Sequence, residues 1–141
     1  MAYTTIDNPT DYFNTLLYTG NGTADRGITG VGFQPDWVWF KNRADVTSHK
    51  IFDSVRGAGL EIETDTTDAE VGTLDAGKLP SFDSDGFTVS ASNTVNGSSD
   101  NMVAWNWLAG GSASSNTNGS ITSSVSANTT AGFSIVSYTG T

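Results

Sequence analysis

The amino-acid sequence predicts an all-β fold, an antiparallel β-sandwich of jelly-roll or lectin-like type. Short runs of alternating apolar and polar residues recur along the chain, and Gly, Asn and Asp stand between them as turn residues. No amphipathic helical pattern of useful length interrupts these runs. About half a dozen short strands separated by turns are typical of sandwiches and barrels. A chain of 141 residues fits one domain with a sizeable core.

The chain begins with an arm, residues 1–11, in which one short helical turn is expected. Asn8 suits the N-cap, Pro9 fits the first helical position, and Asp11 lies in the first turn, where the helix dipole favours a carboxylate. The first strand, residues 15–19, follows this arm and is closed by a Gly-Asn-Gly turn signal.

Two strands, residues 36–42 and 102–109, carry apolar side chains on both faces. Successive side chains of a strand point to opposite faces, so such a strand needs cover on both sides. These two strands are therefore predicted to be central in the sandwich. Seven of their side chains are expected to be largely buried: Trp37, Val38, Trp39, Phe40, Val103, Trp105 and Trp107.

Two further strands are predicted in the middle of the chain, at residues 50–56 and 60–64. The second alternates cleanly, with Leu60 and Ile62 expected to face the core. Glu61 and Glu63 are then expected to share a solvated face. Neighbouring positions on one face lie roughly 7 Å apart along a strand, and no pocket is evident that would make an acid/base pair of them.

Residues 65–78 are polar and contain glycine, which predicts a long loop suited to function or partner contact. Its carboxylates Asp65, Asp68 and Glu70 suggest at most weak binding of Ca²⁺. No other metal or cofactor is expected, and the lack of cysteine excludes a thiolate metal site. A further alternating strand is predicted at residues 87–91.

Four segments describe the expected domain organisation. Residues 1–11 form the arm and residues 12–109 the β-sandwich module. Residues 110–132 are a Gly/Ser/Asn-rich linker or an edge segment, and the flexible composition of residues 110–119 favours a joint. Residues 133–141 are the last strand or the start of a second module.

The end of the chain repeats its beginning, which bears on the last of these segments. The run Phe13 to Gly20 returns as Phe133 to Gly140, with the same interval between phenylalanine and tyrosine. Tandem β-domains produce such spacing, whereas a chance match of two strands that end in Thr-Gly is the alternative.

Catalytic signals are weak. The single histidine, His49, stands just before a predicted strand, and no Gly-x-Ser-x-Gly serine is present to use it as a base. The run Asp83 to Gly86 resembles the opening of a calcium loop but lacks its closing glutamate, so a turn is expected there. We therefore expect no enzyme activity. Trp39 and Trp105 can provide aromatic faces for sugar rings, although core packing is the stronger expectation for tryptophans on central strands.

The charge of the chain limits its partners. Fifteen acidic and six basic residues give a net charge of −9, which repels phosphate backbones and anionic membranes. Nucleic acid and membrane are therefore not expected as partners. The first residues lack a basic segment followed by an apolar stretch, so synthesis in a cytoplasm without an export signal is expected.

Four segments carry a resemblance to a known family: residues 32–43, 48–58, 81–87 and 102–107. In order and spacing they resemble a module common in structural proteins of marine tailed bacteriophages, and the match extends along essentially the whole chain. This resemblance implies a concanavalin-A-like sandwich that often occurs in tandem, in fibre or surface-decoration proteins of the virion.

The resemblance supplies no ligand site that can be transferred to this sequence. Five residues are carried forward as candidates for a ligand site or an interface: Trp39, His49, Asp53, Arg56 and Trp105. Of these, Asp53 and Arg56 are expected to pair across a turn and to hold the loop that follows them.

The preferred interpretation is a virion structural protein, on a fibre or on the capsid or tail surface, that contacts other virion proteins. A lectin-like module that binds a host surface glycan is the alternative. A symmetric homo-oligomer, most simply a trimer, is expected, because a repeated surface patch is satisfied by a rotation axis. Residues 1–11 and 65–78 are expected to contact its neighbouring subunits or the virion shell.

Overall fold

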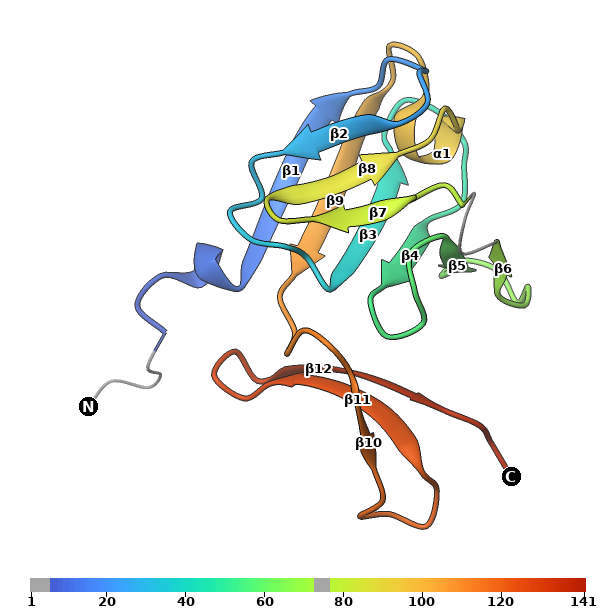
Figure 1. Ribbon diagram of the computed structural model, residues 1–141. Coiled ribbons are helices and arrows are strands. Elements are labelled where there is room, and N and C mark those ends of the chain that lie inside the picture. The colour runs from blue at the N-terminus through green and yellow to red at the C-terminus, as the bar shows by residue number, and fades with distance from the viewer. Residues whose placement is uncertain (1–5, 73–76) are drawn as a thin grey trace.

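A computed structural model describes residues 6–72 and 77–141 of the chain. It confirms the predicted all-β class, because antiparallel sheets account for nearly all of its regular structure (Figure 1). The elements are η1 (Pro9–Asp11), β1 (Phe13–Thr19), β2 (Arg26–Thr29), β3 (Trp37–Asn42), β4 (Lys50–Asp53), β5 (Leu60–Glu63), β6 (Val71–Gly72), β7 (Ser81–Asp83), β8 (Gly86–Val89), α1 (Asn93–Asn96), β9 (Asn101–Trp107), β10 (Ser114–Asn116), β11 (Ser123–Asn128) and β12 (Phe133–Tyr138).

Two of the three sheets form the sandwich. The larger has six strands in the order β1-β9-β3-β4-β5-β6, and the smaller has the order β2-β8-β7 (Figure 1). As predicted, the two strands with apolar residues on both faces are central, since β3 pairs with both β9 and β4, and β9 also pairs with β1. We call the face of the six-stranded sheet that turns toward β2-β8-β7 its inner face and the opposite face its outer face.

The hydrophobic core fills the space between the two sheets of the sandwich. Phe40 lies at its centre, and its ring meets the rings of Phe52 and Phe87 edge-on at 5.8 and 5.0 Å between centroids. All three side chains are fully buried. The other members of this cluster are Ile28, Val31, Phe33, Val38, Leu79, Val89, Val95 and Ala104.

Of the seven side chains on the central strands that were expected to be buried, three are buried and four are partly exposed. Val38 and Phe40 are fully buried on the inner face, and Val103 is almost buried on the outer face. The four tryptophans lie on the outer face and remain partly exposed. The reason is that a third sheet covers only part of this face.

The alternation of β5 was assigned to the wrong faces. Glu61 is buried, with 3% of its surface exposed, whereas Ile62 is 38% exposed. The inward position of the carboxylate is compensated by cations, because Nζ of the buried Lys50 lies 3.0 Å from Glu61 Oε1 and also bonds Glu63. Lys78 reaches the same Glu61 oxygen at 2.5 Å. An alternating pattern does not reveal which face receives such partners.

The third sheet has the order β10-β11-β12 and lies beside the ends of β3 and β9 (Figure 1), where it contacts the outer face. It contains the segment expected to be a linker or an edge, and β11 is its middle strand. Phe133 on β12 packs against Trp37 and Trp107, each at 6.1 Å between ring centroids. The run Phe133 to Gly140, which repeats Phe13 to Gly20 in the sequence, thus contains β12 of this small sheet, as the first run contains β1 of the six-stranded sheet.

The connection from β9 to the third sheet is held in place, in contrast to the expected flexible joint. Asp36 is almost fully buried, and its Oδ2 accepts hydrogen bonds from the amides of Ala109 (2.8 Å) and Gly111 (3.3 Å). Ser126 of β11 accepts from the Gly110 amide. A Cβ at Gly110 would lie 2.3 Å from the carbonyl oxygen of Ala127, so this close approach requires glycine.

Two turns follow the sequence prediction. Pro9–Asp11 is a 3-10 turn preceded by Asn8, although the Asn8 side chain bonds Thr10 and Asp11 side chains in place of a backbone amide. The expected turn at residues 83–86 is a tight hairpin that joins β7 to β8. Residues 1–5 of the expected arm and 73–76 of the expected loop lie outside the described residues.

Candidate binding face of the six-stranded sheet

The outer face presents two groups of side chains, and they contain all five candidate residues. Trp39, Trp105 and His49 form one group, which we call the aromatic cluster. Asp53 and Arg56 belong to the second, beside β12. Phe133 of the third sheet packs on Trp37 and Trp107. It does not pack on the aromatic cluster.

The aromatic cluster joins neighbouring strands and the loop before β4. Trp39 and Trp105 lie opposite each other on β3 and β9, with 5.4 Å between ring centroids and 53° between planes. The ring of His49 lies 5.9 Å from that of Trp39. The main chain of His49 is fixed at both ends, because its amide donates to Asp65 Oδ1 and its carbonyl accepts from Thr64.

Polar atoms in the aromatic cluster lack protein partners. Trp39 Nε1, His49 Nδ1 and the nearby Thr47 Oγ1 are shielded from solvent, and none has a hydrogen bond within the described residues. Buried donors and acceptors without partners cost free energy unless a water or a ligand satisfies them. The cluster therefore combines tilted aromatic rings with unsatisfied polar atoms.

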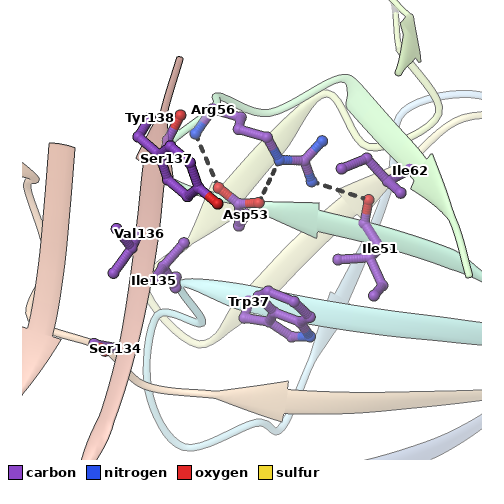
Figure 2. Close-up of a pocket in the computed structure, with 10 residues that line it drawn as sticks. All are labelled: Trp37, Ile51, Asp53, Arg56, Ile62, Ser134, Ile135, Val136, Ser137 and Tyr138. Carbon is purple, nitrogen blue, oxygen red and sulfur yellow. Dashed lines mark hydrogen bonds and ion pairs between the residues drawn. The ribbon is translucent and has the colours of Figure 1, made fainter. Parts of the chain in front are cut away.

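The second group lines a groove of about 410 Å³ beside β12, which we call the β12 groove (Figure 2). Trp37, Ile51 and Ile62 of the six-stranded sheet form its apolar floor, and Ser134 to Tyr138 form its wall. Successive side chains of a strand point to opposite faces, so five consecutive residues line one groove only when the strand presents its edge. The wall is thus the free edge of β12.

Arg56 and Asp53 close one end of the β12 groove (Figure 2). Arg56 Nε lies 2.5 Å from Asp53 Oδ2, and Asp53 Oδ1 accepts from the amides of Val55 and Arg56. The predicted pair across the turn is confirmed. Arg56 also bonds Glu70 at 2.7 Å. Each nitrogen of the guanidinium thus has a partner within the protein, and the groove offers little net charge to a ligand.

The charge of the chain is distributed very unevenly. All fifteen acidic and six basic residues lie within residues 1–100, so β9 and the whole third sheet carry none. The segment from residue 12 to residue 24, which contains β1, is also free of charged residues. Sequence inspection by motif missed this feature, although a plot of charge along the chain would reveal it.

Exposed apolar side chains concentrate in the same uncharged regions. β1 exposes Phe13 (37%) and Leu17 (65%), and β12 exposes Val136 (50%) and Tyr138 (65%). Ile62, in the β12 groove, is 38% exposed. Since β1 and β12 are both outer strands of their sheets, each combines a free main-chain edge with exposed apolar side chains.

Lys50, Glu61, Glu63 and Lys78 form a charged cluster away from the β12 groove. Burial lowers the pKa of Lys50, but the hydrogen bonds that Lys50 donates to Glu63 and Glu61 outweigh this effect, so the net shift of the pKa is upward. The hydrogen bond from Lys50 holds the pKa of Glu63 below its usual value. This cluster lies toward the inner face and stabilises the structure there.

The loop carboxylates expected to bind Ca²⁺ weakly have protein partners. Glu70 pairs with Arg56, and Asp65 accepts from the His49 amide. Within residues 6–72 and 77–141, no three acidic, histidine or cysteine side chains gather as a metal site. The same described ranges contain no helix with the length and apolar character that crossing a bilayer requires. Weak Ca²⁺ binding and the expected lack of enzyme activity stay predictions.

Comparison with family models places nearly the whole fold in one family. Residues 8–141 match the model described as "Domain of unknown function (DUF7483)". The chain belongs to this family. The match runs from η1 through β12, so the third sheet is part of the DUF7483 domain together with the sandwich. Searches of curated proteins and of solved structures found no match.

Proposed function

We propose that this DUF7483 domain is a structural protein of a bacteriophage virion that acts through protein–protein contacts on the fibre, capsid or tail surface. The observation that carries the contact role is the coincidence of two free strand edges, exposed apolar side chains and the lack of charge in residues 12–24 and 101–141. Natural sheets usually protect a long edge with Lys, Pro or a bulge. An edge without such protection is suited to association.

Two considerations support the virion setting. The first is the sequence resemblance to structural modules of marine tailed bacteriophages. The second is the net charge of −9, which suits a solvent-facing surface and opposes contact with packaged nucleic acid. The localisation that follows is the virion surface, with other virion proteins as partners.

The direct test locates the protein on particles. Antibodies raised against the purified chain are applied to intact virions and to virions whose capsids have been opened, and bound antibody is seen by electron microscopy. Labelling of intact particles at a fixed fibre, capsid or tail position supports the proposal. Lack of the protein from particles by mass spectrometry, or labelling only after opening, contradicts it.

A second candidate function, binding of a host glycan, is favoured by the aromatic cluster. Tryptophan faces pack against the apolar faces of sugar rings, and Trp39 and Trp105 are partly exposed on the outer face. A glycan array tests this with the wild-type chain, Trp39→Ala, Trp105→Ala and the control Trp37→Ala, whose ring lies under Phe133. Binding that Trp39→Ala and Trp105→Ala abolish, and the control retains, supports it. Lack of binding by the wild type rejects it.

A further inference from the structure

Two strand edges of the chain have matching properties. β1 has seven residues and β12 has six, and neither contains a charged residue. Each is an outer strand, paired on one side only among the described residues. Each exposes two large apolar side chains. A protein with a net charge of −9 repels its own copies, so an approach through uncharged surfaces has the smallest electrostatic cost.

The middle of β1 offers main-chain groups for pairing. The Thr15 amide donates to Asn14 Oδ1, and the Thr19 carbonyl accepts from Arg26, so neither group is directed at β9. These two residues therefore direct main-chain groups toward the free edge. Because hydrogen bonding alternates along an antiparallel strand, Leu17 between them also directs its N–H and C=O outward. Its side chain is 65% exposed on the outer face.

The β12 groove can receive such a strand. Its wall is the edge of β12, which supplies main-chain donors and acceptors, and its floor is apolar (Figure 2). A strand added at this edge would extend the third sheet over the floor, with alternate side chains facing Ile51 and Ile62. The outer-face side chains of β1, Phe13 and Leu17, are apolar and exposed, so they suit that floor.

We propose that β1 of one copy of this chain adds to the free edge of β12 of a second copy, within the β12 groove. This inference rests on the proposed role in protein–protein contact and names its partner. The contact is head-to-tail, because it joins two different edges. Repetition of such a contact produces a closed ring if the rotation closes, and a filament if it does not.

The test blocks each edge separately and then mixes the variants. Leu17→Lys places a charge on the β1 edge and Val136→Lys places one on the β12 edge, at side chains that are already exposed. Val46→Lys is the matched control. Val46 is fully exposed in the loop between β3 and β4, and its substitution changes the net charge by the same amount as the edge substitutions. Mass is measured by light scattering over a range of protein concentrations.

The proposal predicts a wild-type mass that is a multiple of the monomer, an unchanged mass for Val46→Lys, and monomers for each edge variant alone. An equal mixture of the two edge variants should give twice the monomer mass, because it retains one free β12 edge and one free β1 edge. A monomeric wild type, association of either edge variant alone, or a monomeric mixture overturns the proposal. Association of one edge variant alone indicates pairing of like edges.

A synthetic peptide covers the case in which an edge variant does not fold, which circular dichroism reveals. The peptide Phe13 to Gly20 should dissociate the wild-type oligomer, whereas a peptide with Leu17→Pro, which lacks that N–H, should not. Failure of the first peptide to change the mass overturns the proposal. Antibody labelling of particles is independent of these masses. A monomeric chain that labels intact virions would therefore contradict this inference alone, and a head-to-tail oligomer absent from virions would contradict the proposed function alone.

Discussion

The two faces of the six-stranded sheet show how the same apolar pattern serves different purposes. The inner face packs Phe40 against Phe52 and Phe87 with none of the three exposed. The outer face carries tryptophans that remain partly exposed, and an uncharged third sheet covers only some of them. Apolar residues on both faces of a strand therefore indicate two contact surfaces, of which only one is the core of the sandwich.

The largest expected effect distinguishes the two faces by stability. Phe40→Ala should lower the free energy of unfolding by about 3–5 kcal/mol, because it leaves a cavity among buried rings. Trp39→Ala should cost about 1–3 kcal/mol, because its indole is partly exposed and its neighbourhood can relax. Urea denaturation of both variants measures the difference. Equal losses of stability would contradict the claim that Phe40 lies in the core whereas Trp39 lies outside it.

The next effect concerns the buried carboxylate of the inner face. Glu61→Gln should lower the free energy of unfolding by about 3 kcal/mol, since it removes a charge that compensates the buried Lys50 while Glu63 still bonds that lysine. Glu70→Gln is the control on the partly exposed ion pair with Arg56 and should cost less than about 1 kcal/mol. A neutral effect of Glu61→Gln would show that Glu61 lies in water, as the sequence alone suggested.

A smaller effect should be strongest in the third sheet, while Asp36 Oδ1 also accepts from Ser54 Oγ beside β4. Asp36→Ala leaves the amides of Ala109 and Gly111 without their acceptor and should cost about 1–3 kcal/mol. Hydrogen exchange should become faster in residues 110–138. The control is Asp85→Ala, which removes the acceptor of the Gly30 and Gly32 amides within the sandwich. Faster exchange of the third sheet in this control as well would contradict a local role for Asp36.

The sequence was sufficient for the class of the fold and for several local features. Alternation identified the central strands, and turn chemistry identified the hairpin at residues 83–86 and the Asp53–Arg56 pair. It did not identify β10 and β11 as strands, because Ser and Asn dominate them and Ser126 is their only buried side chain. Pairing with neighbouring strands, and the packing of Phe133 on Trp37 and Trp107, determine the structure of this sheet. The intrinsic β-propensity of its residues contributes less.

The candidate site was only partly predictable for a similar reason. Trp39, His49 and Trp105 were selected as single residues, and the register of β3 with β9 brings two of them together. The β12 groove depends on where the third sheet lies, which no local pattern encodes. Asp36, which anchors that sheet, looked like an ordinary residue before a strand.

The smallest effect is a pH dependence on the Lys50 cluster. The folded-state pKa of Glu63 is lower than its usual value of 4.5, mainly because Lys50 bonds it, so its stabilising contribution is complete above pH 4.5. That contribution is lost as the pH falls through the folded-state pKa. Urea denaturation between pH 6 and pH 3 should therefore show a steeper loss of stability for the wild type than for Glu63→Gln. Parallel curves would contradict the interaction.

Hydrogen exchange at increasing protein concentration tests most directly whether the edges of β1 and β12 are contact surfaces. The account predicts that the Leu17 amide and the amides of β12 exchange more slowly as the concentration rises, while amides around the exposed Val46 do not change. Exchange at Leu17 and along β12 that is the same at every concentration, up to the limit of solubility, would contradict it.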